Sequence, residues 1–352
     1  MVALALVMAA CNEIQQPEEQ GKMHFTATLA APNSDPTTRT VATADGDNYN
    51  VAWAVDDEIA LVYEDRNGDR QKDKATVTAV DLVTGAATIE CDLNHSVNDG
   101  AAVTLVYPYD VVYEASEDLA MGKSYTFDDY YFTSQKGAAP TEENGIPKYD
   151  WRDGDGTFSV TGSGVTLSGN VTMNPNVAIW KLTLKDVATD PFVAEMMFIQ
   201  RGGPVAAARP ADPASEYYVY VPIPILNHLT TAFAGYPLVI TGSAGGYDYS
   251  YVHSGDVTLT AGKIYESTVT LKQVLMGWIH DSGDDGCYIH YIDGETWAQA
   301  IANHNNWDFT IQDGKVWSPN QMKFLKNADG SAYIDPTTAV DPSATYTWAD
   351  PV

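Results

Sequence analysis

The segment Ile264–Leu271, with the sequence IYESTVTL, alternates between apolar and polar residues. Successive side chains of a β-strand point to opposite faces, so Tyr265, Val269 and Leu271 share one face of such a strand. The glutamate and threonine side chains share the other face. The segment therefore predicts a strand with one buried face and one solvated face.

The same period of two recurs along most of the chain. Phe25–Leu29 and Lys74–Ala79 repeat it, and turn-forming residues separate the apolar segments, as in Arg66–Asp69 and Gly242–Gly246. Asn-Gly in the first of these turns is a strong hairpin signal. The clearest helix candidate is Glu295–Ala302, late in the chain. The sequence therefore predicts an all-β fold with a small helical contribution.

The strand pattern divides the chain into four segments. These are residues 1–22, 23–172, 173–272 and 273–352. Further strands are expected at residues 51–53, 59–63, 87–91, 103–107 and 177–184. The polar, glycine-rich stretch from 135 to 164 is expected to be a loop of the first unit or the exit from it.

Length and charge limit the possible partners. A chain of 352 residues has room for two or three domains. Its 19 Lys and Arg residues against 47 Asp and Glu residues give a net charge of −28, and the acidic excess is spread along the chain. Nucleic acid is therefore not expected as a partner. An anionic membrane surface would also repel the chain, so membrane attachment is expected through a lipid only.

The beginning of the chain has the pattern of an export signal. The apolar run Val2–Ala10 ends at Cys11, and a polar, acidic stretch follows. The run is shorter than the roughly 20 residues that span a bilayer as a helix. Met8-Ala9-Ala10-Cys11 resembles the lipobox of bacterial lipoproteins, which predicts a signal peptide and tether over residues 1–22 with lipidation at Cys11. The alternative is a buried first strand with a core cysteine. Cys91 and Cys287 are expected to be unpaired, mostly buried thiols.

Several short motifs resemble, in order and spacing, the fimbrillin-type (type V pilus subunit) surface lipoproteins of Bacteroidetes. These motifs are Cys11, the Phe25 strand, Thr38–Thr40, Trp53 with Asp56–Ile59, Tyr107–Tyr109, Asn176–Ile179 and Ala261–Tyr265. The similarity covers roughly residues 11 to 272. It implies that segments 23–172 and 173–272 are tandem β-sandwich domains. It also implies a cell-surface protein of the outer membrane that is assembled into fimbriae.

The resemblance also implies a processing step. In the family, a surface protease cuts after an arginine and removes the lipidated segment together with the first strand. Arg39 is the only arginine before Arg66, so the expected cut lies between Arg39 and Thr40. The open groove would then take a strand from another pilus subunit, which is donor-strand exchange. The alternatives are that Arg39 is an ordinary loop residue, or that an anchor subunit keeps its lipid.

Residues 273–352 form a tryptophan-rich extension beyond the last expected sandwich strand. They hold five of the eight tryptophans, at positions 278, 297, 307, 317 and 348. Such an extension suits a tip or accessory subunit. Trp307 and Trp317 are candidate ligand-binding residues for host or bacterial surface glycans or proteins, because aromatic faces stack on sugar rings. Most of the tryptophans could equally pack a small core. The alternative function is a surface glycan-binding lipoprotein that does not polymerise.

No catalytic or metal motif stands out. Asp65–Asp69 resembles a calcium loop, but Arg70 and Thr76 stand where glycine and glutamate are needed, so a hairpin turn is expected. Gly-x-Ser-x-Gly, His-Glu-x-x-His and P-loop motifs are missing from the sequence. The sequence therefore predicts no enzyme, no cofactor and no metal site.

Overall fold

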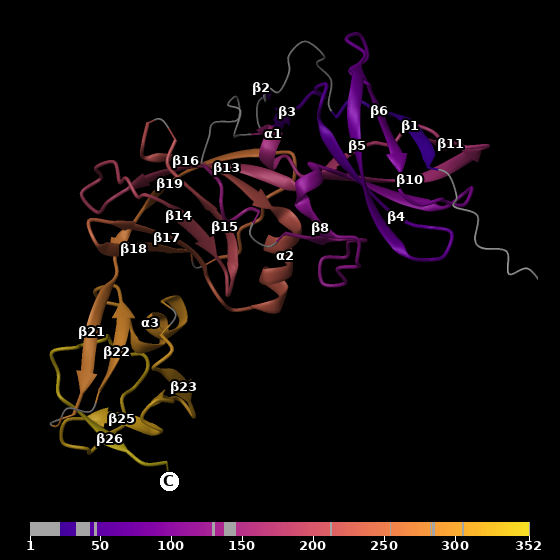
Figure 1. Cartoon of the computed structure of the whole chain (residues 1–352). Coiled ribbons are helices and arrows are strands. Elements are labelled where there is room, and N and C mark those ends of the chain that lie inside the picture. The colour runs from indigo at the N-terminus through magenta and orange to yellow at the C-terminus, as the bar shows by residue number, and fades with distance from the viewer. Residues whose placement is uncertain are drawn as a thin grey trace, which may run out of the picture.

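The computed structural model is built mainly from β-strands, as the sequence predicts (Figure 1). It describes residues 22–32, 43–45, 48–128, 131–136, 146–211, 213–253, 255–281, 283, 286–304 and 306–351. Within these ranges the strands are joined by short helices, of which α2 (Ile223–Ala232) is the longest. The all-β prediction is confirmed.

The first unit is one large sheet around a hydrophobic core. Its strand order is β11-β1-β6-β5-β4-β7-β10-β12, and β11 also pairs with β10, so the sheet closes on itself. The strands are β1 (Met23–Leu29), β4 (Glu58–Glu64), β5 (Arg70–Val80), β6 (Ala87–Leu93), β7 (Ala102–Tyr107), β10 (Arg152–Thr161), β11 (Gly164–Leu167) and β12 (Asn174–Pro175). Short elements in its connections are β2 (Thr43–Asp45), β3 (Asn48–Asn50), η1 (Tyr109–Val111), β8 (Val112–Glu114), β9 (Thr126–Phe127) and α1 (Ile146–Tyr149).

The second unit packs two sheets face to face over a second core. The three-stranded sheet has the order β16-β13-β19 and the five-stranded sheet has the order β15-β14-β17-β18-β20. The strands are β13 (Val177–Lys185), β14 (Met197–Gln200), β15 (Pro204–Ala208), β16 (Glu216–Pro222), β17 (Leu238–Ala244), β18 (Tyr247–His253), β19 (Ile264–Thr270) and β20 (Lys272–Gln273). In β19 and just after it, Val269 and Leu271 face this core with Tyr265 packed beside them, as the alternation predicts.

The C-terminal extension is a separate small unit that projects from the second one (Figure 1). Its elements are β21 (Leu275–His280), β22 (Gly286–Tyr291), α3 (Trp297–Asn303), β23 (Thr310–Gln312), β24 (Lys315–Ser318), β25 (Lys323–Asn327) and β26 (Tyr346–Ala349). The predicted helix forms because Thr296 and Gln299 make a capping box at its start. Trp297 is buried and Ile301 packs beside it in the core of the extension.

Two sequence expectations are wrong in detail. Residues 51–53 form no strand, although Trp53 is buried against Tyr107 with ring centroids 5.4 Å apart. The loop expected within 135–164 is wrong for residues 152–161, which form β10, a ten-residue strand of the main sheet. Its glycines misled the prediction. A Cβ at Gly154 would lie 2.4 Å from the carbonyl oxygen of Thr172. Strand β10 therefore needs glycine at position 154, where the backbone at Thr172 passes close to it.

A further core joins the first and second units. Residues from the outer face of the first sheet, including Val62 and Val106, meet Val177 and Tyr220 of the three-stranded sheet. Tyr149 lies against Tyr220 with ring centroids 5.5 Å apart. The two units are therefore held together by apolar packing as well as by the chain between them.

Gln135 stabilises the interface between the first and second units from a fully buried position. Its side-chain amide donates to the carbonyl of Tyr220 over 2.8 Å and its oxygen accepts from the Tyr220 amide over 2.8 Å. Its backbone also pairs with β15, through the Ala207 carbonyl at 3.2 Å and the Arg209 amide at 3.2 Å. A residue expected in a loop thus supplies strand-like hydrogen bonds to the second unit.

Replacing Gln135 by alanine is expected to lower the free energy of unfolding by about 2–3 kcal/mol. The change removes both side-chain bonds to Tyr220 and leaves buried polar groups unsatisfied. Urea denaturation followed by circular dichroism measures the loss. Gln312→Ala is the matched control, because Gln312 is exposed on β23. Equal stability of the two variants would contradict the role given to Gln135.

Candidate functional site

The first strand is the candidate site for strand exchange. In β1, the alternate residues Met23, Phe25, Ala27 and Leu29 are 5%, 0%, 6% and 0% exposed, and all four belong to the first core. The residues between them point away from the core and are exposed or half-buried. The strand therefore fills a groove with pockets at every second position.

Backbone pairing holds this strand mainly on one side. β1 runs antiparallel to β6 over seven positions, from Met23 opposite Leu93 to Leu29 opposite Ala87. On its other side it pairs in parallel with β11 at two positions only. Past that pairing, the amide of Ala30 donates to the carbonyl of Val171 over 3.1 Å. Without β1, the edges of β6 and β11 would present unpaired N–H and C=O groups beside an apolar groove.

The chain beyond β1 is held at two carbonyl groups. The indole Nε1 of Trp53 donates to the Ala30 carbonyl over 2.9 Å, and the guanidinium of Arg152 donates to the Pro32 carbonyl over 3.5 Å. Trp53 is one of the residues that carries the family resemblance. Its role here is to fix the exit of the first strand.

The predicted lipidation and processing residues lie outside the described part of the chain. Cys11 precedes residue 22, and Arg39 and Thr40 fall between the described ranges 22–32 and 43–45. Lipidation and cleavage therefore stay predictions. Among the described residues, no helix is both long enough and apolar enough to cross a membrane.

The two candidate ligand-binding tryptophans have different surroundings. Trp307 is 86% exposed and lines a cavity of about 450 Å³. Trp317 is half-buried in β24, where its ring meets Phe324 edge to face at 4.7 Å, and it is not among the described residues that line this cavity. The structure therefore separates the two residues. Of the other three, Trp297 is buried, Trp348 packs beside the core, and Trp278 is 38% exposed.

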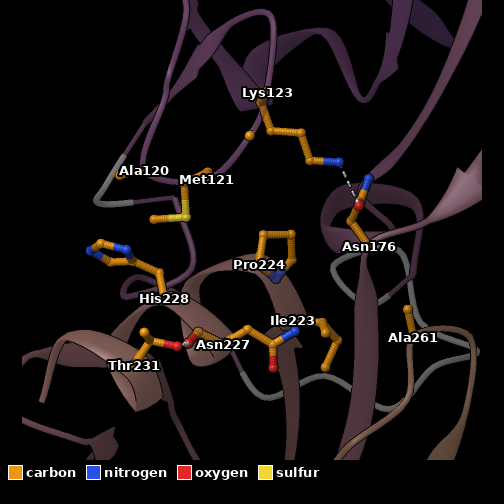
Figure 2. Close-up of a pocket in the computed structure, with 11 residues that line it drawn as sticks. Ala120, Met121, Lys123, Asn176, Ile223, Pro224, Asn227, His228, Thr231 and Ala261 are labelled. Carbon is orange, nitrogen blue, oxygen red and sulfur yellow. Dashed lines mark hydrogen bonds between the residues drawn. The ribbon is translucent and has the colours of Figure 1, made fainter. Parts of the chain in front are cut away.

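A second hollow, of about 490 Å³, lies between the first and second units (Figure 2). Lys123 reaches across it and donates to Asn176 over 2.9 Å and to Asp153 over 2.6 Å. The backbone of Asn176 also bonds to Trp151 and to Ile223. Because the ammonium group already binds these partners, we interpret Lys123 as a link between the units.

The described residues assemble neither an activated cysteine thiol nor a metal site. Burial, and then the charge of Asp73, raise the pKa of the Cys91 thiol to about 12. Both Cys91 and Cys287 are free, as expected. Asp65 accepts hydrogen bonds from the backbone amides of Asn67 and Asp69 and forms the β4–β5 hairpin turn. In the described ranges, no group of three or more metal-binding side chains is assembled.

The comparison with solved structures finds bacterial fimbrial and cell adhesion proteins. A fimbrial assembly protein from Parabacteroides distasonis shares 10% identity over 77% of this chain and 96% of its own, with a TM-score of 0.34. A candidate cell adhesion protein from Bacteroides fragilis shares 10% identity over 78% and 98%, with a TM-score of 0.37. Another, from Bacteroides eggerthii, shares 11% identity over 94% and 96%, with a TM-score of 0.31.

These names agree with the fimbrillin-type resemblance of the sequence. Neither protein-family models nor curated proteins match the sequence. At TM-scores this low, the structural likeness carries no argument about function.

Glu295 holds two of the residues that line the cavity beside Trp307. Its carboxylate accepts from His304 Nε2 over 2.6 Å, from Asn303 Nδ2 over 2.8 Å and from the Ile292 amide over 2.8 Å. Burial alone would raise the pKa of Glu295, but these hydrogen bonds and the charge of His304 outweigh burial and lower the pKa below 4.5. The carboxylate therefore fixes the wall of the cavity in its charged form.

Acid is expected to weaken the extension through Glu295. A folded-state pKa below the unfolded value adds stability above the unfolded pKa, and this stability is lost as the pH falls through the folded pKa. Thermal unfolding at a series of pH values checks this for the native chain and Glu295→Gln. The native chain should be the more stable of the two near neutral pH, and the difference should shrink below about pH 4. A difference that does not change with pH would contradict the assignment.

Proposed function

We propose that the protein is a fimbrial subunit or adhesin of a bacterial cell surface. On this proposal it is exported as a lipoprotein attached to the outer membrane through Cys11. It acts as a structural protein and not as an enzyme. It joins other pilus subunits by donor-strand exchange, after a protease removes the anchor and the first strand.

The observation that carries the proposal is the placement of β1. This strand contributes four alternate residues to the first core, and the single arginine before residue 66, Arg39, follows it in the sequence. A cut after Arg39 would therefore separate a complete groove-filling strand from the rest of the chain. The vacated groove would offer backbone pairing along β6 and side-chain pockets at alternate positions, which suits an incoming strand.

The C-terminal extension favours a tip or accessory subunit over a shaft subunit. It follows the last strand of the second unit and has its own core, and it exposes Trp307 beside a cavity. The same exposed tryptophan supports the second candidate function. That candidate is a surface glycan-binding lipoprotein that keeps β1 in place and does not polymerise.

Intact mass and N-terminal sequencing of the protein recovered from the cell surface test the proposal. A chain that begins at Thr40 supports removal of β1 and assembly by strand exchange. A chain that begins at an acylated Cys11 contradicts processing and favours an anchor subunit or the glycan-binding candidate.

A further inference from the structure

The cavity beside Trp307 lies between the second unit and the extension. One wall is the outer face of the five-stranded sheet, with Gln200 on β14, Thr241 on β17 and Ser250 on β18. The other wall comes from the extension, with Trp307 and residues at the end of α3. Its volume, about 450 Å³, is in the range of sites for small ligands.

A buried hydroxyl group in this cavity lacks a partner. Ser250 is 1% exposed, and its Oγ has no hydrogen-bond partner among the described residues. Such a group costs free energy unless something binds it, so native proteins contain few of them. Ser250 is one of the residues that line the cavity.

The neighbours of Trp307 are fixed although its indole is exposed. The buried side chain of Asn306 accepts from the His290 amide over 2.7 Å and donates to the carbonyls of His290 and Ala300. On the other side, Asp308 accepts from the Tyr288 amide over 3.1 Å. An aromatic ring that is exposed on an anchored backbone is pre-organised for contact with a ligand, because little further ordering is needed on binding.

The lining favours an uncharged, hydroxyl-rich ligand. The described residues around the cavity include no lysine or arginine, and the carboxylate present, Asp248, accepts a hydrogen bond from Ser243 over 2.8 Å. Amide and hydroxyl groups of Gln200, Thr241 and Asn303 supply both donors and acceptors. An anionic ligand would find no lysine or arginine among these residues, and His304 is already held by Glu295 over 2.6 Å.

We propose that this cavity binds a neutral sugar. Trp307 stacks on the ring, and Ser250 with the neighbouring amide groups binds its hydroxyls. The aromatic surface continues along the hairpin. Tyr288 shares the outer face of β22 with His290, and its ring contacts that of Trp278 in a tilted arrangement, with centroids 4.6 Å apart and planes at 52°. A longer glycan therefore extends from the cavity onto Tyr288 and Trp278.

A glycan array tests this inference on the full chain. The array carries neutral and sialylated mammalian glycans together with fragments of bacterial polysaccharides, so that it also distinguishes the two sources. The tightest neutral glycan is then measured by titration calorimetry. We expect Trp307→Ala to weaken its binding by at least ~10-fold and Ser250→Ala to weaken it by ~3-fold or more. Tyr113→Ala is the control, because Tyr113 is 68% exposed on β8, outside the cavity.

Three results would overturn the inference: no glycan bound, sialylated glycans bound alone, or a neutral glycan whose affinity Trp307→Ala leaves unchanged. Trp307→Ala keeps the test valid even if Ser250→Ala unfolds, because an indole that is 86% exposed adds little to folding. Strand exchange does not enter this experiment. Absence of processing at Arg39 would leave sugar binding intact, so the two proposals fail separately.

Discussion

Replacing Phe25 by alanine is expected to lower the free energy of unfolding by about 3–5 kcal/mol. The Phe25 side chain is fully buried, and its ring meets Phe158 edge to face with centroids 5.8 Å apart. Its loss removes transfer free energy and leaves a cavity in the first core. Chemical denaturation, with tryptophan fluorescence as the signal, measures the change.

Thr28→Ala provides the matched control on the same strand. Thr28 is exposed and faces away from the core, so its replacement should change the stability by no more than about 0.5 kcal/mol. If the two variants were equally stable, β1 would not be filling the groove. Strand exchange at this groove would then have no structural basis.

The sequence predicted the strands where one face is buried and the other is solvated. Ile264–Leu271 alternates for this reason, and β19 occupies nearly the same residues. The loop prediction was wrong for residues 152–161 because Gly154 and Gly156 look like turn residues. A Cβ at Gly154 or Gly156 would collide with residues 171 and 172 of the same chain. A local sequence pattern does not contain such a contact. The sequence did not predict helix α2 either, because Pro222 and Pro224 stand at its start and also look like turn residues.

The candidate sites were predictable to different degrees. Phe25 and its strand could be found from alternation, and Trp307 from the aromatic content of the extension. Ser250 could not be found, because its importance depends on a sheet face that meets the extension about 50 residues later in the sequence. The same holds for Gln135, which bonds to Tyr220 across two units. Cys11, Arg39 and Thr40 were named from the sequence alone and lie outside the described residues.

Once the chain is cut between β1 and β2, residues 22–32 should exchange with an added peptide of the same sequence. A specific protease site placed between residues 33 and 42 allows the cut in the purified full chain. We expect a fluorescent 22–32 peptide to remain on the cut chain through gel filtration and not to remain on the uncut chain. In the cut chain the strand is held by β6 pairing and by four buried side chains without a covalent link.

A peptide with Phe25→Asp distinguishes binding in the groove from nonspecific binding. A carboxylate in the Phe25 pocket would be buried among the apolar side chains of the first core, next to Phe158. That cost is several kcal/mol, so the peptide should bind at least ~100-fold more weakly than the native sequence. A Thr28→Ala peptide should bind like the native one, because Thr28 points to solvent. Equal retention of the Asp peptide, or retention on the uncut chain, would mean that the groove is not the binding site and that strand exchange is not the mechanism.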